Sequence, residues 1–128
     1  MIKKLVLPLL ALLVGCTPQQ KTVLIADFRN ACAYPVNVDV YAYSNAKEPF
    51  SFTRRVMPGE TIEVLSYISF ESDIRTGTPD SYTLTVTANG QQIKLNKSGF
   101  LDNLTAAKIG AHGSAVDIWV VDTKRLCP

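Results

Sequence analysis

The sequence predicts an all-β protein, an antiparallel sandwich with little helix. Two observations carry this prediction: several segments alternate apolar and polar residues with a period of two, and turn-forming pairs lie between them. Such alternation gives a strand one apolar face, and that face has to be covered by a second layer. The pattern therefore favours two packed sheets over a helical bundle.

About seven segments are expected to form strands, because they alternate or are rich in β-branched and aromatic residues. They are Val23–Phe28, Val36–Tyr41, Phe50–Val56, Ile62–Phe70, Tyr82–Ala88, Gln91–Leu95 and Val116–Val121. Short strands at this spacing favour a β-sandwich of immunoglobulin-like or transthyretin-like type, and a small β-barrel is the second choice.

Turn residues join several of these segments. Asn89-Gly90 suits a type I′ hairpin, because both residues tolerate a positive φ. Met57-Pro58-Gly59-Glu60 is expected to reverse the chain between the third and fourth segments. A short helix is expected over Asn103–Ile109, after an N-cap at Asp102. The Glu71–Asp80 segment contains a glycine and a proline and is expected to be a mobile loop.

Length and charge limit the function classes. A chain of 128 residues has room for one domain. Lys3 and Lys4 belong to the N-terminal segment described next, and without them 11 of the 13 basic residues remain against 11 acidic ones. Binding to nucleic acid requires a clustered surplus of Lys and Arg, whereas beyond that segment basic residues adjoin only in pairs, such as Arg54-Arg55. We therefore expect no nucleic-acid partner.

The N-terminus has the architecture of a secretory signal peptide. Met1–Lys4 is a basic start, and Leu5–Val14 is an apolar stretch of ten residues. A membrane-spanning helix needs about twenty apolar residues, so this stretch is too short to span. Residues 1–15 are therefore expected to be removed, and 113 of the 128 residues remain.

The end of this stretch, Leu13-Val14-Gly15-Cys16, resembles the lipobox of bacterial lipoproteins. The resemblance covers residues 1 to about 17 and implies a diacylglyceryl group on the thiol of Cys16, cleavage before that residue and acylation, as by palmitate, of the new amine. Two or more acyl chains hold a protein firmly in a membrane, because each buried CH₂ contributes about 0.8 kcal/mol. Residues 22–128 match no domain family that we recognise.

The residues after Cys16 predict where the domain is held. The resemblance to lipoproteins of enteric bacteria implies that an Asp directly after the modified cysteine would signal retention in the inner membrane. In this sequence Thr17 occupies that position instead. We therefore expect an outer-membrane lipoprotein whose domain faces the periplasm. Residues 16–21 form a tether of roughly 20 Å at about 3.5 Å per residue, which keeps the domain of residues 22–128 near the lipid.

Two further cysteines, Cys32 and Cys127, form an even pair in an oxidising compartment. A disulfide between them is expected. A redox or metal-binding pair would need a C-x-x-C spacing or neighbouring histidines, and neither accompanies these two residues.

The sequence offers no constellation for catalysis, metal binding or a cofactor. His112 is the single histidine, and the G-x-S-x-G pattern that would support a nucleophile such as Ser114 is absent. The carboxylate pairs, such as Glu71 and Asp73, fall at expected turns, where water keeps both ionised. No glycine-rich phosphate loop occurs. We therefore expect neither an enzyme nor a cofactor-binding protein.

Aromatic residues are the better candidates for a functional surface. If the β-branched side chains of their strands point inward, four aromatic side chains point outward: Tyr41, Tyr43, Tyr67 and Trp119. Exposed aromatic rings are enriched at protein interfaces. The alternative is that these rings pack across neighbouring strands on a partly covered face.

Three functions are consistent with these features. The first is a non-enzymatic lipoprotein that binds a protein partner in an envelope assembly, such as a secretion or pilus system. The second is an inhibitor or immunity protein against a cell-wall hydrolase, with Glu71–Asp80 or Gly110–Ala115 as the inserted loop. The third is an enzyme acting on envelope polymers, and it is the least favoured because no residue set supplies both a nucleophile and a base.

Overall fold

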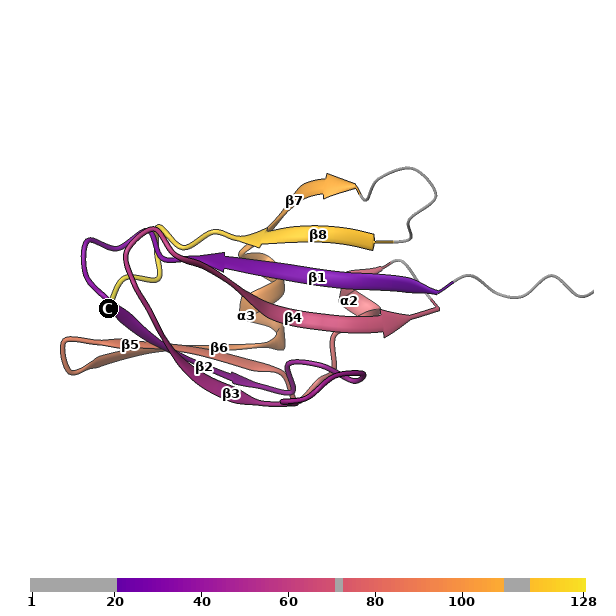
Figure 1. The fold of residues 1–128 in the computed structure, drawn as a ribbon, viewed down its shortest axis with the longest axis horizontal. Coiled ribbons are helices and arrows are strands. Elements are labelled where there is room, and N and C mark those ends of the chain that lie inside the picture. The colour runs from indigo at the N-terminus through magenta and orange to yellow at the C-terminus, as the bar shows by residue number, and fades with distance from the viewer. Residues whose placement is uncertain (1–20, 71–72, 110–115) are drawn as a thin grey trace, which may run out of the picture.

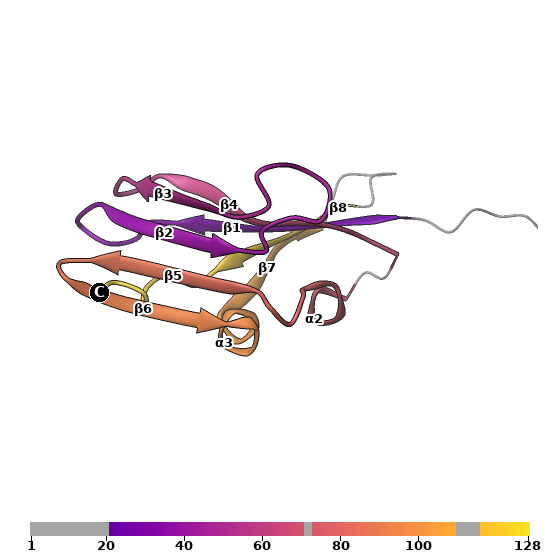
Figure 2. The same cartoon turned by 90° about the horizontal axis from the view of Figure 1, so that it is seen from below.

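The computed structural model describes residues 21–70, 73–109 and 116–128, and within them two four-stranded sheets pack face to face. Sheet A has the strand order β4-β1-β8-β7, and sheet B has the order β3-β2-β5-β6 (Figures 1 and 2). The strands are β1 Thr22–Arg29, β2 Val36–Tyr41, β3 Phe52–Val56, β4 Thr61–Ser69, β5 Thr83–Ala88, β6 Gln91–Asn96, β7 Leu104–Ile109 and β8 Val116–Val121. The all-β sandwich predicted from the sequence is confirmed, as two separate sheets rather than one closed sheet.

The predicted helix over Asn103–Ile109 is wrong. Leu104–Ile109 instead form β7, a strand beyond the seven that were expected, and β7 pairs antiparallel with β8. A helix of one or two turns is marginal on its own. As a strand, the same segment forms hydrogen bonds with the edge of β8 that faces away from β1, whose backbone groups would otherwise be unpaired. The helix lies earlier: α3 covers Lys97–Asp102, and its N-cap is Asn96, whose side chain accepts a hydrogen bond from Gly99 N at 2.9 Å.

The interior is built from the inward faces of both sheets. Val36, Val38 and Val40 of β2 are all buried, as the alternation predicts. Tyr82 and Phe100 pack ring to ring at 4.3 Å between centroids, and both are fully buried. The Tyr82 hydroxyl donates to the carbonyl of Val64 at 2.7 Å, so this buried polar group is satisfied.

The two turns predicted from the sequence differ in outcome. Asn89 and Gly90 have φ values of 54° and 74°, as a type I′ turn requires, and they join the paired strands β5 and β6. Gly59 also has a positive φ, of 79°, but the turn it occupies connects β3 of sheet B to β4 of sheet A. That turn is a corner between the layers, not a hairpin within one sheet.

A buried asparagine organises this corner of the sandwich. The Asn30 amide donates to the carbonyls of Tyr34 at 2.9 Å and Val56 at 3.0 Å, and its oxygen accepts from Cys32 N at 2.8 Å. Its backbone bonds both sides of the β3–β4 turn, since Gly59 N donates to Asn30 O and Asn30 N donates to Glu60 O. Asn30, through its backbone and its side chain, thus ties the end of β1 to the turn and to the residue that forms the disulfide.

The predicted disulfide between Cys32 and Cys127 is present, with sulfur atoms 2.07 Å apart and Cα atoms 5.6 Å apart. It joins the segment after β1 to the end of the chain, 95 residues later. The Tyr34 hydroxyl adds a hydrogen bond to the carbonyl of Pro128 at 2.5 Å. The C-terminal segment is therefore fixed to the end of the sandwich where β1 finishes (Figure 1).

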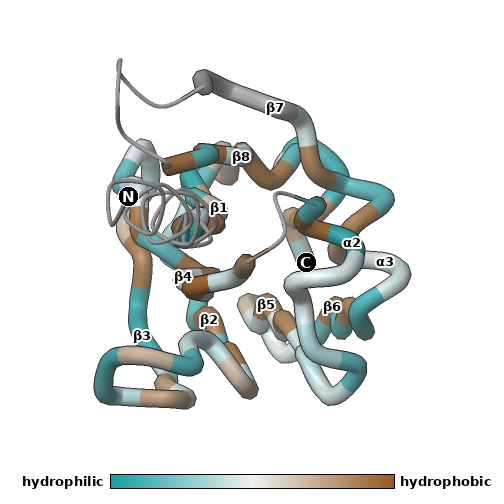
Figure 3. The backbone as a smooth tube through the Cα atoms, turned by 90° about the vertical axis from the view of Figure 1, so that its right-hand side faces the viewer, coloured by the Kyte–Doolittle hydropathy of each residue, from teal (hydrophilic) through white to brown (hydrophobic). Residues whose placement is uncertain are grey.

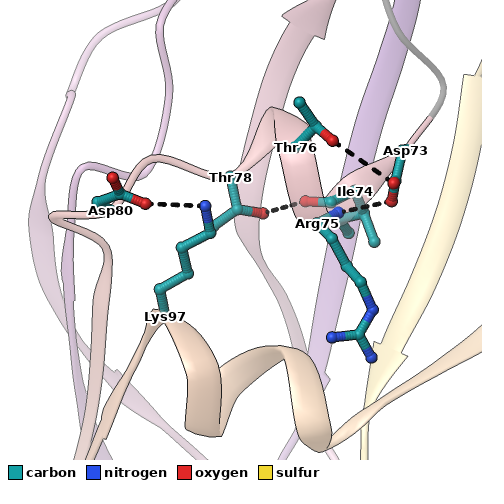
Figure 4. Close-up of polar contacts among 7 residues, drawn as sticks. All are labelled: Asp73, Ile74, Arg75, Thr76, Thr78, Asp80 and Lys97. Atoms are coloured by element: carbon teal, nitrogen blue, oxygen red, sulfur yellow. Dashed lines mark hydrogen bonds and ion pairs between the residues drawn. The ribbon is translucent and has the colours of Figure 1, made fainter.

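The segment expected to be a mobile loop contains a short helix, α2, over Ile74–Gly77. Asp73 caps it by accepting from Arg75 N at 2.9 Å, and Asp80 beyond it forms an ion pair of 3.0 Å with Lys97 at the start of α3 (Figure 4). Ile74 and Thr78 are buried. α2 and α3 lie together at one side of the sandwich, and β3 lies at the other (Figure 3).

Loss of the disulfide is expected to destabilise the domain strongly. The chain-entropy model assigns a bridged loop of this length about 4–5 kcal/mol, and removal of a native disulfide from a small secreted domain costs about 2–5 kcal/mol. Cys32→Ser should therefore lower the free energy of unfolding, measured in guanidinium chloride, by that amount. The parent protein under reducing conditions is the control and should unfold at the same midpoint as the variant; a variant as stable as the oxidised parent would contradict the prediction.

Candidate functional site

The candidate site is a hollow between β3 and β4, on the side of the sandwich opposite the helices. We name it the β3 groove. Its volume is about 330 Å³, and its lining is Tyr43, Pro49, Phe52, Thr53, Arg54 and Glu63. Aromatic rings, a proline and charges of both signs thus meet at one open edge.

The chain reaches the groove by leaving sheet B after β2. Ala42 has a φ of 60°, which an alanine seldom adopts, and the Tyr67 hydroxyl donates to its carbonyl at 2.7 Å. The following residues run beside the edge of β4: Ser66 N donates to Tyr43 O at 2.9 Å, and the Asn45 side chain bonds both backbone groups of Ile68. This segment covers the outer edge of β4 and brings Tyr43 to the groove.

An ion pair and a hydroxyl fix the groove's inner wall. Tyr43 donates its hydroxyl to Glu63 Oε1 at 2.6 Å, and Lys47 Nζ lies 2.7 Å from the same oxygen. The Lys47 ammonium also lies 5.7 Å from the centre of the Tyr43 ring, and Phe52 meets that ring edge to face at 5.1 Å. Arg54 pairs with Glu60 at 3.2 Å at the rim.

Two carboxylates near this wall have opposite pKa shifts. Burial raises the pKa of Glu63, but the hydrogen bonds from Lys47 and Tyr43 outweigh it, so the pKa of Glu63 is lowered overall. Asp27 lies opposite Glu63 in the β1–β4 ladder. Burial, followed by the neighbouring charge of Glu63, raises the pKa of Asp27.

The polar wall acts as a structural ion pair. Glu63 Oε1 is occupied by the hydroxyl of Tyr43 and the ammonium of Lys47, so this oxygen is not free to activate a nucleophile. Among the residues that the structure describes, no three His, Cys, Asp or Glu side chains gather as metal ligands would. The lining combines apolar rings with charged side chains of both signs.

Of the four aromatic residues expected on the surface, Tyr41 does point outward and is 58% exposed. Tyr43 is 7% exposed, so its expected outward orientation is wrong. The physical reason is that β2 ends at Tyr41, and the chain then turns around the sandwich edge, which ends the alternation. Tyr41 lines a second hollow beside the groove, and Phe52 and Thr53 line both hollows.

The expected outward orientation of Tyr67 is also wrong, because β4 carries a bulge. The β1–β4 register shifts by one residue between Ala26 and Asp27, so Val64 and Leu65 are both buried and the alternation reverses beyond them. Tyr67 therefore lies opposite Leu24 and packs against the core.

Trp119 has the opposite orientation to the expected one. β8 pairs in parallel with β1, and its register places Trp119 opposite Ala26, a fully buried residue. Trp119 packs against the core, and its Nε1 is buried without a hydrogen-bond partner in the described structure. The residues expected to point inward, Val116, Ile118 and Val120, lie opposite Val23, Ile25 and Asp27 on the outer face of sheet A. Both faces of β8 carry large apolar side chains, and Asp117 lies on the same face as Trp119, so the alternation favoured the wrong orientation.

The remaining expectations fall partly outside the described residues. Cys16, His112 and the Gly110–Ala115 segment belong to the ranges 1–20 and 110–115, which the structure does not describe. No helix among the described residues has the length and apolarity needed to cross a membrane. Comparisons with protein-family models, with curated proteins and with solved structures find no match to this chain.

Several groove residues were not singled out in the sequence. The Phe50-Ser51-Phe52 alternation was a usable signal for one of them, since it places Phe50 and Phe52 on one face. Glu63 gave no signal, because it meets its neighbours Lys47 and Asp27 only through the β1–β4 ladder and the segment that folds over its edge.

The raised pKa of Asp27 predicts that Asp27→Asn stabilises the protein. Because the folded-state pKa lies above the unfolded one, the ionised carboxylate weakens the folded state at neutral pH, and the penalty disappears as pH falls below the ordinary value of about 3.9. We expect a melting temperature a few degrees above that of the parent at pH 7, and no difference near pH 3, by differential scanning calorimetry.

Glu63→Gln is the matched control with the opposite sign. The lowered pKa of Glu63 means that its charge stabilises the folded state above the ordinary value of about 4.3, and this contribution is lost as pH falls through the folded-state pKa. Glu63→Gln should therefore melt below the parent at pH 7. Equal shifts of the same sign in the two variants would contradict the assignment.

Proposed function

We propose that the chain is a membrane-anchored lipoprotein of the bacterial envelope and that its sandwich binds a protein partner through the β3 groove, without catalysis. The observation that carries the proposal is the groove itself, an aromatic and charged hollow beside an edge strand. Tyr41 and Phe50 extend the apolar surface, since they are 58% and 52% exposed.

The form of the partner follows from β3. Among the described strands, β3 pairs with β2 alone, so its other edge offers backbone donors and acceptors to an added strand. Arg54 and Arg55 protect this edge from unspecific pairing, because two positive charges disfavour a neutral or basic strand. The partner that fits is an extended segment with an apolar side chain for the hollow and acidic side chains for the arginines.

The N-terminal sequence supports the anchor. The Leu13-Val14-Gly15-Cys16 motif ends six residues before β1 begins at Thr22, so a lipid on Cys16 would hold the sandwich within roughly 20 Å of the bilayer. A disulfide-bonded domain is what an oxidising periplasm favours. We place the protein at the outer membrane, since Thr17 follows the cysteine.

The anchor is tested on protein isolated from cells. Mass spectrometry of the mature N-terminus should find a peptide that begins at Cys16 and carries a diacylglyceryl group and an amide-linked acyl chain. The parent should stay in the membrane fraction at high salt and alkaline pH, because its acyl chains bury many CH₂ groups. Cys16→Ser should lack the lipid. An unmodified thiol at this position, or a parent protein that washes off, would remove the proposal.

The groove is tested by comparing two charge reversals. Tagged lipidated protein would be crosslinked in membranes and captured; Arg54→Glu should reduce recovery of the partner by about tenfold, because an arginine at an interface often contributes more than 1 kcal/mol. Lys94→Glu, an exposed charge on the opposite edge strand β6, is the matched control and should leave recovery unchanged. Equal recovery by both variants, or no stoichiometric partner with the parent, would refute a binding role for the groove.

A further inference from the structure

The outer face of sheet A carries apolar side chains at the end where the chain enters β1. Val23 lies opposite Ile68 on one side and opposite Val116 on the other, so the three share one face. Ile68 is 42% exposed, and Phe70, directly after β4, is 57% exposed. Lys21 Nζ lies 6.0 Å from the centre of the Phe70 ring. We name these five residues the near-end patch.

The same face changes character along the strands. Asp27 and Glu63 pair on it toward the other end of β1, whereas Lys21 is the charged residue in the near-end patch. An anionic lipid surface attracts lysine and repels carboxylates. A face of this kind can touch a bilayer with its near end only, while the acidic part stays in water.

We propose that the near-end patch rests in the headgroup region of the membrane that holds the anchor. The proposal depends on the proposed lipidation of Cys16, which leaves six residues before β1 and keeps this end of the sandwich beside the lipid. The patch has the composition of an interfacial contact, with an aromatic ring, branched aliphatic side chains and a lysine whose stem can lie along them.

The geometry gives the domain a defined orientation. The chain enters at the end of sheet A where β1 and β8 begin and β4 ends, and the β3–β4 turn lies at the opposite end (Figure 1). An eight-residue strand such as β1 is roughly 26 Å long. The turn that contains Met57 is therefore held well away from the lipid when the near-end patch is in contact.

The test uses tryptophan as a reporter in the full lipidated protein. Phe70→Trp, Tyr41→Trp and Met57→Trp would be purified from membranes and reconstituted into vesicles of phosphatidylethanolamine and phosphatidylglycerol, with or without brominated phosphatidylcholine. All three positions are at least half exposed, so the larger ring needs no repacking of the core. The signal of the parent, from Trp119, is subtracted, and thermal unfolding confirms that each variant is folded.

We expect the brominated lipid to reduce the Phe70→Trp emission about twofold, because an interfacial side chain lies at the headgroup and acyl boundary. Met57→Trp, at the far end, should be unaffected. Tyr41→Trp reports the same end of the other sheet and should be quenched less than Phe70→Trp. Equal quenching at the three positions, or stronger quenching at Tyr41 than at Phe70, would overturn the proposal.

Two further readouts separate the alternatives. If Phe70→Trp is shielded from acrylamide but not quenched by brominated lipid, a second copy or another protein covers the patch, and the membrane contact is refuted. If the protein does not float with the vesicles and its Cys16 carries no lipid, the proposed anchor has failed. If it floats with the vesicles, carries the lipid and is not quenched at Phe70, only the membrane contact has failed.

Discussion

The position of β1 between β4 and β8 is the constraint on which the rest of the structure depends. Its antiparallel pairing with β4 sets the bulge that turns Tyr67 toward the core, and its parallel pairing with β8 turns Trp119 inward. At its end, Asn30 and the bridge at Cys32 fix the interlayer turn and the C-terminal segment. At its start the chain leaves toward Cys16. β1 is thus linked to the C-terminal segment through the bridge at Cys32, and to sheet B through the hydrogen bond of Asn30 with Val56.

The sequence was informative where a local pattern had a single structural solution. The alternation in β2 fixed which side chains are buried, and Asn89-Gly90 fixed a hairpin because few residue pairs tolerate two positive φ values. The bridge between Cys32 and Cys127 was predictable for a different reason: with Cys16 assigned to the proposed lipid anchor, these two are the remaining cysteines of the sequence.

The errors arose where the outcome depended on a neighbouring strand. Large apolar side chains occur on both faces of β8, so only its pairing with Ala26 of β1 could decide that Trp119 lies inward. Leu104–Ile109 form a strand because they pair with the free edge of β8. The presence of that edge cannot be inferred from the local sequence of Leu104–Ile109. The β3 groove was out of reach in the same way, since Glu63 and Lys47 meet through a segment folded over the edge of β4.

The parallel arrangement of β1 and β8 also has a mechanical consequence. A pull on the chain at Lys21 acts along β1, in the direction in which its hydrogen bonds to β4 and β8 are loaded side by side. Such a shear load is shared by two ladders at once, whereas a load at the end of a hairpin opens one rung after another. Beyond Arg29 the bridge at Cys32 passes tension covalently to the end of the chain. A pull applied at Lys21 is therefore resisted by both ladders of β1 and by the bridge at Cys32.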